Sequence, residues 1–345
     1  MPINYEPIDT TTDVATTRTL LHEVIPLTGT IVSGTYGTFP NDDNIKNYSH
    51  GMFQSVYDYP YLSSSANHIF DLTAGFDESS VLSGSFSSVQ ETKKINMYNQ
   101  FSQVLLGYTG STNRVRLFES DLTLDEDSPM KETIFVNLSR LLTKDEIKKG
   151  SVSITLGTAS WANPFSGVKT FTDASATENA GTLNTIGGDY GILSSSTGVG
   201  GVIFYQAGVM VLTSSIWTGT TDFFSQSGTA RTIDNQLVSG SISGSADAFR
   251  HRLYNLQFNN TTEINSTVYF CRMPHNKFNY SSNPTYLNAG SIRVKNNSRN
   301  NPPISYITTV GLYNSQNELL AVAKLSEPLR KDPTNELTLR VRLDY

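Results

Sequence analysis

The C-terminal part of the chain alternates apolar and polar residues with the two-residue period of a β-strand. Over residues 337–344, each Leu or Val is followed by Thr, Arg or Asp. Successive side chains of a strand point to opposite faces, so this pattern predicts one buried face and one charged face. Two further apolar segments lie within residues 305–329, and turns at 314–317 and 331–335 separate the three. We therefore expect three C-terminal strands that serve structure or assembly, because they carry no catalytic pattern.

A helical pattern is clearest at about residues 89–106. Ser87 or Ser88 can cap the start, Glu91 falls in the first turn, and Gly107 follows as a stop. The residues at three-to-four spacing are Ile95, Tyr98, Phe101 or Ser102, and Leu105. This spacing predicts a helix with one apolar stripe.

A second, shorter helix is expected at about residues 140–149. Thr143 and Glu146 have the spacing of a capping box. Lys148 and Lys149 precede Gly150, where cations would complement the carboxyl end of a helix.

Strand patterns continue between and beyond these helices. Residues 132–137 and 151–156 are expected to be strands, and residues 200–213 a hairpin with Gly208 in its turn. Residues 218–247 contain few apolar anchors besides Phe223 and Phe224. We interpret that stretch as a mobile excursion from the fold.

Three portions are expected along the chain. Residues 1–150 form a β-rich portion with both helices, and residues 151–270 form a Gly-, Ser- and Thr-rich β portion with long loops. Residues 271–345 supply the C-terminal strands that complete the fold. One interpretation is that the middle portion is inserted within the fold that these strands complete.

The composition favours sheets over helices. Hydrophobic residues make up 37% and charged residues 16% of the chain, and both fractions lie below ordinary globular usage. Ser, Thr, Asn and Gly fill the difference, and these residues suit strands and loops better than helices. We predict a mainly β protein with β-sandwich-like or barrel-like sheets and long loops. One or two short-to-medium helices would give its N-terminal half an α+β character.

The charge and hydropathy of the chain argue against two classes of partner. The formal net charge is −6, whereas proteins that grip nucleic acid are usually basic, so we expect no nucleic-acid partner. No apolar run approaches the roughly 20 residues that span a bilayer, so we expect no membrane insertion. The N-terminus lacks the positive and apolar regions of a secretory signal, and none is expected.

Motifs for catalysis or cofactor binding are absent from the sequence. The single cysteine, Cys271, lies in a strand-like run, where a buried structural thiol is the favoured interpretation. The five histidines are dispersed, and the acidic stretch Asp125–Asp127 lacks the EF-hand pattern and is interpreted as a solvated loop. Neither a P-loop nor a nucleophile elbow occurs. We therefore expect no catalytic residue, no cofactor and no metal, and we predict that the protein is not an enzyme.

Five segments resemble virion structural proteins of contractile-tailed bacteriophages, particularly myoviruses of the marine cyanophage type. These segments are residues 50–61, 134–150, 201–212, 270–286 and 307–325. The resemblance implies a structural subunit of the virion, assembled in the host cytoplasm. It implies a place in the baseplate or adjoining tail, with other virion proteins as partners in a symmetric, multi-copy assembly. A neck or head-surface position is the alternative place.

Two aromatic segments are the candidate partner-contact sites. One is Phe278, Asn279, Tyr280 and Tyr286, in a turn that Pro284 stiffens. The other is Tyr57, Tyr59 and Tyr61. The first segment would form a rigid loop that either docks on a neighbour or covers its own core, and the sequence leaves both interpretations open.

Two other functions compete with a purely structural role. The aromatic and Asn-rich loops would suit a tail protein that binds glycans of a host receptor, although the repetitive shaft of a fibre protein is absent. A weaker alternative is a tail enzyme that degrades polysaccharide.

Overall fold

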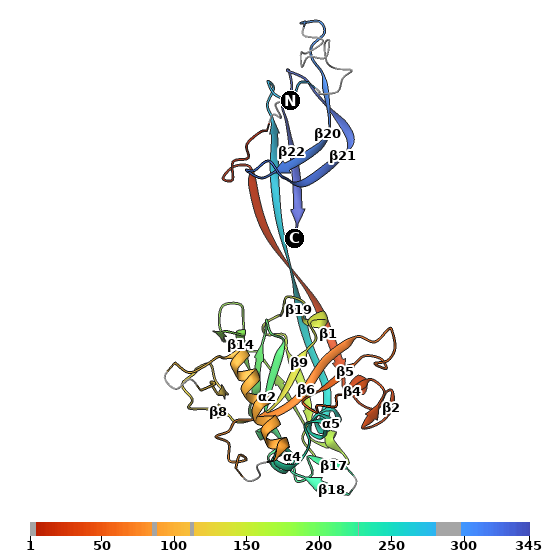
Figure 1. Cartoon of the computed structure of the whole chain (residues 1–345), viewed down its shortest axis with the longest axis vertical. Coiled ribbons are helices and arrows are strands. Elements are labelled where there is room, and N and C mark those ends of the chain that lie inside the picture. The colour runs from red at the N-terminus through yellow and green to blue at the C-terminus, as the bar shows by residue number, and fades with distance from the viewer. Residues whose placement is uncertain (1–4, 85–87, 111–113, 227, 281–297) are drawn as a thin grey trace. The chain divides into compact units, whose positions relative to one another are not determined.

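The computed structural model describes residues 5–84, 88–110, 114–226, 228–280 and 298–345 (Figure 1). The chain is 46% strand and 16% helix, which confirms the prediction of a mainly β fold. It divides into two compact units: unit 1 comprises Met1–Leu20 and Glu263–Tyr345, and unit 2 comprises Leu21–Thr262. The boundaries of these units, at residues 20/21 and 262/263, differ from those of the three portions expected from the sequence.

Strands β1 (Val14–Thr28) and β19 (Leu253–Met273) have residues in both units. The strands wholly within unit 2 are β2 (Gly37–Thr38), β3 (Asn41–Asp42), β4 (Ile45–Asn47), β5 (Gln54–Tyr57), β6 (His68–Phe76), β7 (Phe118–Glu119), β8 (Pro129–Met130), β9 (Glu132–Leu138), β10 (Glu146–Ile147), β11 (Ser153–Gly157), β12 (Val168–Thr172), β13 (Thr182–Thr185), β14 (Gly188–Ser195), β15 (Gly198–Phe204), β16 (Val209–Thr213), β17 (Phe224–Gln226) and β18 (Thr229–Arg231). Its helices are α1 (Gly29–Val32), α2 (Val89–Leu105), α3 (Arg140–Thr143), α4 (Ile233–Ser239), α5 (Ile242–Arg252) and the short 3-10 turns η1 (Pro164–Ser166) and η2 (Ser214–Trp217). None of the helices in the described part of the chain is long and apolar enough to cross a bilayer.

The main sheet of unit 2 runs in the order β19-β11-β12-β14-β15-β16-β9-β6-β5-β4, with antiparallel neighbours. Its central strands are buried on both faces, since neighbouring residues of β9 belong to different hydrophobic clusters. Ile134 and Val136 lie in the first cluster, and Phe135 lies in the second. Strands buried on both faces are continuous apolar runs, as in 201–205 and 209–212. The predicted hairpin between β15 and β16 is confirmed, with Gly208 at a φ of 68° in its turn.

Helix α2 confirms the predicted helix at 89–106. The Ser88 side chain accepts a hydrogen bond from the Glu91 backbone N–H at 3.2 Å, and Gly107 has a φ of 83° just beyond the last turn. The helix packs directly on β6, where a Cβ added to Gly75 would lie 2.6 Å from the Lys94 carbonyl oxygen. A side chain at position 75 would therefore push α2 off the sheet.

The second predicted helix, at 140–149, is wrong beyond its first turn. Helix α3 ends at Thr143, and Lys144 has a φ of 57°, which no helix accommodates. The helix is capped by Ser139, whose side chain accepts from the Leu141 N–H at 3.3 Å. Residues 146 and 147 pair with β19 as strand β10, and Ile147 is wholly buried. Burial in the sheet outweighs the local helical signal.

The interpretation of residues 218–247 as a mobile excursion is also wrong. This stretch contains α4 and the first half of α5, and Phe223, Ile233 and Leu237 are buried in the first hydrophobic cluster. Small residues in α5 such as Ala246 allow the helix to pack closely despite its low hydrophobicity. The sequence therefore predicted too few helices, since the described residues contain five α-helices.

The three predicted C-terminal strands of unit 1 are confirmed as β20 (Ser305–Tyr313), β21 (Leu319–Lys331) and β22 (Leu337–Asp344). Strand β22 pairs antiparallel with β19, and β20 pairs antiparallel with β21. Along β22, Val341 is buried while Arg340 and Arg342 are exposed. The strand thus has the more buried face and the exposed, charged face that its alternating sequence predicted.

A buried arginine fixes the part of unit 2 around α5. Arg250 is 1% exposed, and its guanidinium donates to Asp42 at 3.0 Å and to Asp247 at 2.9 Å. It also donates to the Gln54 side chain at 2.9 Å and to the Val32 carbonyl at 2.7 Å. These contacts tie α5 to β5 and to residues 32–42.

Arg250→Ala should therefore destabilise unit 2 by about 3–5 kcal/mol, because it leaves the buried Asp42 carboxylate without its cation. The measurement is urea unfolding followed by the fluorescence of Trp161 and Trp217, the two tryptophans of the chain, which both lie in unit 2. The control is Arg140→Ala, an exposed arginine, which should cost less than about 1 kcal/mol. Equal effects of the two substitutions would contradict a structural role for the buried ion pair.

Candidate functional site

The described residues of unit 1 bury few apolar side chains. Only Val268, Met273, Leu312 and Val341 among them are buried, and each is 4–8% exposed. Both hydrophobic clusters consist of residues of unit 2. The two strands β20 and β21 form a separate two-stranded sheet, and such a sheet is at best marginally stable in water.

Several large apolar side chains of this two-stranded sheet are exposed. We define the hairpin patch as Tyr313, Leu319, Leu320 and Val322, of which Leu320 is 68% exposed. Val322 lies opposite Gly311, and a Cβ built at Gly311 would lie 2.9 Å from the Tyr313 ring and 3.1 Å from Leu319. The absence of a side chain at Gly311 thus lets its apolar neighbours gather at the end of the hairpin. A cluster of exposed apolar side chains of this kind is typical of an interaction surface.

The candidate contact residues at 278–280 divide into an internal and an external part. Asn279 is internal, since its side chain donates to the His275 carbonyl at 2.7 Å and accepts from the Lys331 ammonium at 2.8 Å. Lys331 is wholly buried, and burial lowers the pKa of its amine. Phe278 has a φ of 59° and its carbonyl accepts from the Ser305 hydroxyl, whereas Tyr280 is 37% exposed. Tyr286 lies outside the described residues.

The second candidate group lies in unit 2. Tyr57 is half-buried, its ring meets that of His68 edge to face at 5.5 Å, and burial raises the pKa of its hydroxyl. Tyr59 and Tyr61 are exposed, and the Tyr59 ring contacts that of Tyr36 at 5.3 Å. The two candidate groups therefore belong to different units of the chain.

The buried carboxylate of Asp173, a group that could carry chemistry, is held in structural hydrogen bonds. The Asp173 carboxylate accepts from the N–H groups of Gly150 and Val152, each at 2.8 Å, and from the Tyr205 hydroxyl at 3.0 Å. Burial raises the pKa of Asp173 and, at the half-buried Cys271, raises the pKa of the thiol. A thiol with a raised pKa is a poor nucleophile at neutral pH.

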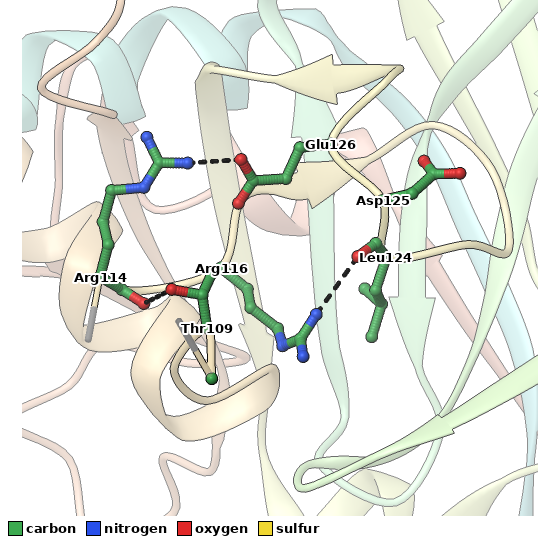
Figure 2. Close-up of a pocket in the computed structure, with 7 residues that line it drawn as sticks. Thr109, Arg114, Arg116, Leu124, Asp125 and Glu126 are labelled. Carbon is green, nitrogen blue, oxygen red and sulfur yellow. Dashed lines mark hydrogen bonds and ion pairs between the residues drawn. The ribbon is translucent and has the colours of Figure 1, made fainter. Parts of the chain in front are cut away.

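A hollow of about 500 Å³ lies beside the loop that follows β7 (Figure 2). Its two arginines already bind the loop itself: Arg114 pairs with Glu126 at 2.6 Å, and Arg116 donates to the Leu124 carbonyl at 3.2 Å. Hydrogen bonding to Glu126 raises the pKa of Arg114. Arg114 is thus paired with a carboxylate of the loop, and Arg116 is held by a backbone carbonyl.

A second, more apolar hollow of about 520 Å³ is lined by residues of unit 2, including Phe165, Tyr254, Arg250 and His251. The His251 ring stacks on Trp161 at 4.3 Å, and burial lowers the pKa of the imidazole. The arginine is occupied by its own ion pairs. The hollow is therefore a largely apolar cavity whose arginine is already paired with carboxylates of the chain.

Three carboxylates of the described residues lie close enough to hold a metal ion. Oxygen atoms of Glu119, Asp121 and Asp127 lie within 4.8 Å of one another. The acidic stretch Asp125–Asp127, which includes one of these carboxylates, was visible in the sequence, but Glu119 was not identified. Glu119 reaches the cluster through the pairing of β7 with β8. Spacing along the chain gives no sign of that pairing.

Comparison of the chain with protein-family models, with curated proteins and with solved structures finds no match.

Asn279→Ala should destabilise unit 1 by about 1–3 kcal/mol, because the buried Lys331 ammonium loses a hydrogen-bond acceptor. Hydrogen exchange of the β22 backbone amides measures this loss. Tyr280→Ala, on the exposed neighbour, should change the exchange by no more than about 0.5 kcal/mol. If Asn279→Ala left β22 exchange unchanged, the side chain would not be the internal brace described here.

Proposed function

We propose that the chain is a non-enzymatic structural subunit of a tailed-phage virion, placed in the baseplate or adjoining tail. It acts through protein–protein contacts with other virion proteins in a symmetric, multi-copy assembly. The five segments that resemble virion structural proteins support this proposal. The scarcity of buried apolar side chains in the described part of unit 1 is the observation that carries it.

Large apolar side chains on β20 and β21 are left exposed to solvent. Removing apolar surface from water contributes roughly 25 cal/mol for each Å² and is the main favourable term in folding and association. In the described part of unit 1, Tyr306, Leu320 and Val322 remain more than half exposed. A neighbouring subunit that covers β20 and β21 would supply the apolar burial that is scarce among the described residues of unit 1. Permanent assembly interfaces bury roughly 2,000 Å² or more, which strands of this length can provide.

The charge distribution is consistent with contact through unit 1. Unit 1 carries 11 Lys and Arg residues against 9 Asp and Glu residues, a net charge of +2. Unit 2 carries 14 against 22, a net charge of −8, and the two values add to the −6 of the whole chain. Strong net charge of one sign keeps surfaces apart, whereas a nearly neutral surface does not oppose close approach.

If the proposal is right, mass spectrometry of purified phage particles will detect the chain at a constant ratio to other virion proteins. A density map of the particle will place it in the baseplate or adjoining tail. Purified particles that lack the chain would contradict the proposal.

The double substitution Leu320→Asp and Val322→Asp should reduce incorporation into particles about tenfold or more. Each change removes roughly 1.5–3 kcal/mol of apolar burial, and about 1.4 kcal/mol is a factor of ten in affinity. The control is Val89→Asp, at a 71% exposed position at the start of α2, where an acidic residue suits the helix N-terminus. Wild-type incorporation of the double variant would exclude the hairpin patch as a contact.

A further inference from the structure

The loop between β7 and β8 places an oxygen-bearing side chain at every second position. These residues are Glu119, Asp121, Thr123, Asp125 and Asp127. The ends of the loop are fixed, because Glu119 pairs with Pro129 and the Ser120 N–H donates to the Ser128 carbonyl at 3.0 Å.

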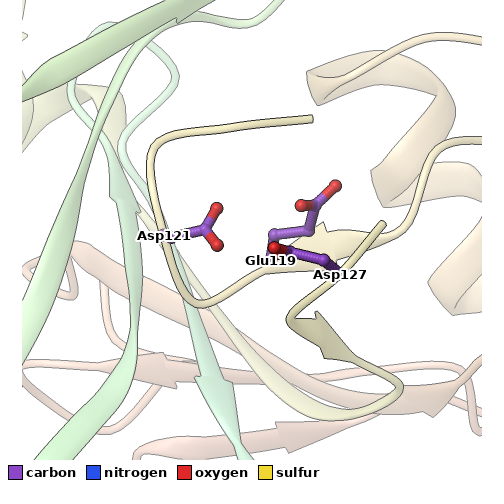
Figure 3. Close-up of side chains that lie close together, drawn as sticks. All are labelled: Glu119, Asp121 and Asp127. Carbon is purple, nitrogen blue, oxygen red and sulfur yellow. The ribbon is translucent and has the colours of Figure 1, made fainter. Parts of the chain in front are cut away.

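The carboxylates turn toward one another within this loop. Figure 3 shows the side chains of Glu119, Asp121 and Asp127 gathered inside it, and their oxygens lie within 4.8 Å of one another. The Thr123 hydroxyl bonds Asp121 at 2.8 Å and Asp125 at 3.1 Å, which brings Asp125 to the rim of the same group. Like charges at this separation repel, so the loop holds them together at a cost.

Glu119 is also buried, and one of its carboxylate oxygens is unsatisfied among the described residues. Its side chain is 3% exposed, and one carboxylate oxygen, Oε1, accepts from the Glu126 N–H at 3.1 Å. The other oxygen, Oε2, is buried, and no hydrogen-bond donor of the described residues reaches it. Leaving a buried carboxylate oxygen without a partner costs several kcal/mol in general, so such a group calls for a cation or a proton. Burial raises the pKa of Glu119, with Asp121 and Asp125 adding to the effect.

Neighbouring cations of the chain are engaged elsewhere. Arg114 pairs with Glu126, and Arg116 donates to the Leu124 carbonyl (Figure 2). The nearby Lys131 donates to the Ser79 carbonyl at 3.3 Å. None of these contacts satisfies Oε2 of Glu119.

We propose that Glu119, Asp121 and Asp127 bind one Ca²⁺ ion through their carboxylate oxygens, with Asp125 at the rim. The ligand set consists of hard oxygen donors without His or Cys, which suits Ca²⁺ and not Zn²⁺. Two oxygens on one Ca²⁺, at about 2.3–2.6 Å each, lie at most about 5 Å apart, so the three carboxylates already lie within the span of one ion. Ca²⁺ also tolerates an irregular loop better than Mg²⁺, which demands octahedral geometry. The site departs from the sequence-based expectation of no metal, because it does not follow EF-hand spacing.

Calorimetric titration of the full chain with CaCl₂, after removal of metals by a chelator, tests the site. We expect one Ca²⁺ per chain, bound with a dissociation constant of about 1 mM or tighter. Glu119→Gln and Asp127→Asn should each weaken binding at least about tenfold. Glu178→Gln, at an exposed carboxylate outside the cluster, should leave it unchanged. Absence of saturable binding in the wild type, or unchanged binding in both cluster variants, would overturn the proposal.

Tb³⁺ luminescence gives a second readout that leaves the ligands intact. The Tyr190 hydroxyl donates to the carbonyls of Asp121 and Thr123, each at 3.2 Å, so its ring lies beside the loop and can transfer energy to a bound Tb³⁺. Excitation of tyrosine should give emission from bound Tb³⁺. Added Ca²⁺ should displace the Tb³⁺ and so lower this emission, and Tyr190→Phe should reduce it. Asp127 is exposed, so Asp127→Asn keeps the test valid if Glu119→Gln does not fold. Tb³⁺ emission that Ca²⁺ does not displace would count against the site.

Discussion

Burial of apolar side chains is the interaction on which this structure depends, and the two units have it in very different amounts. In unit 2, the central strands of the sheet are buried on both faces, as Ile134 and Phe135 illustrate by belonging to different clusters. In the described part of unit 1, four apolar side chains are buried and the two strands β20 and β21 pair only with each other. Because hydrophobic burial is the main favourable term in folding, unit 2 has its own source of stability. Unit 1 has far less of it.

Buried charges in unit 2 hold its elements in place through ion pairs and hydrogen bonds. Arg250 is matched by Asp42 and Asp247, and the Asp173 carboxylate has three hydrogen-bond donors. Groups that are satisfied in this way hold elements in place. The buried Oε2 atom of Glu119 is different, since no described donor reaches it, and for that reason it carries the inference of a cation site.

The sequence predicted those elements whose periodicity is strong and whose partners do not alter it. The alternation along β22 and the capped helix α2 were both predicted and confirmed, although the buried face of α2 also contains Glu91 and Lys94. The strand at residues 146–147 was not predicted, because pairing with β19 and the burial of Ile147 override a capping-box pattern. Helices α4 and α5 were missed, since their apolar stripes are short and lie among small and polar residues. Among the candidate contacts, Asn279 proved to brace Lys331, and this role depends on a residue 52 positions away along the chain.

The most direct test of this account is hydrogen exchange of the β20 and β21 backbone amides, measured in the isolated chain and again in the assembled particle. We predict that these amides exchange rapidly in the isolated chain, while those of β9 and β16 in unit 2 are strongly protected. In the particle, the amides of β20 and β21 should become protected as well. Protection of β20 and β21 equal to that of β9 in a chain shown to be monomeric would contradict the claim that unit 1 needs a partner to complete its burial.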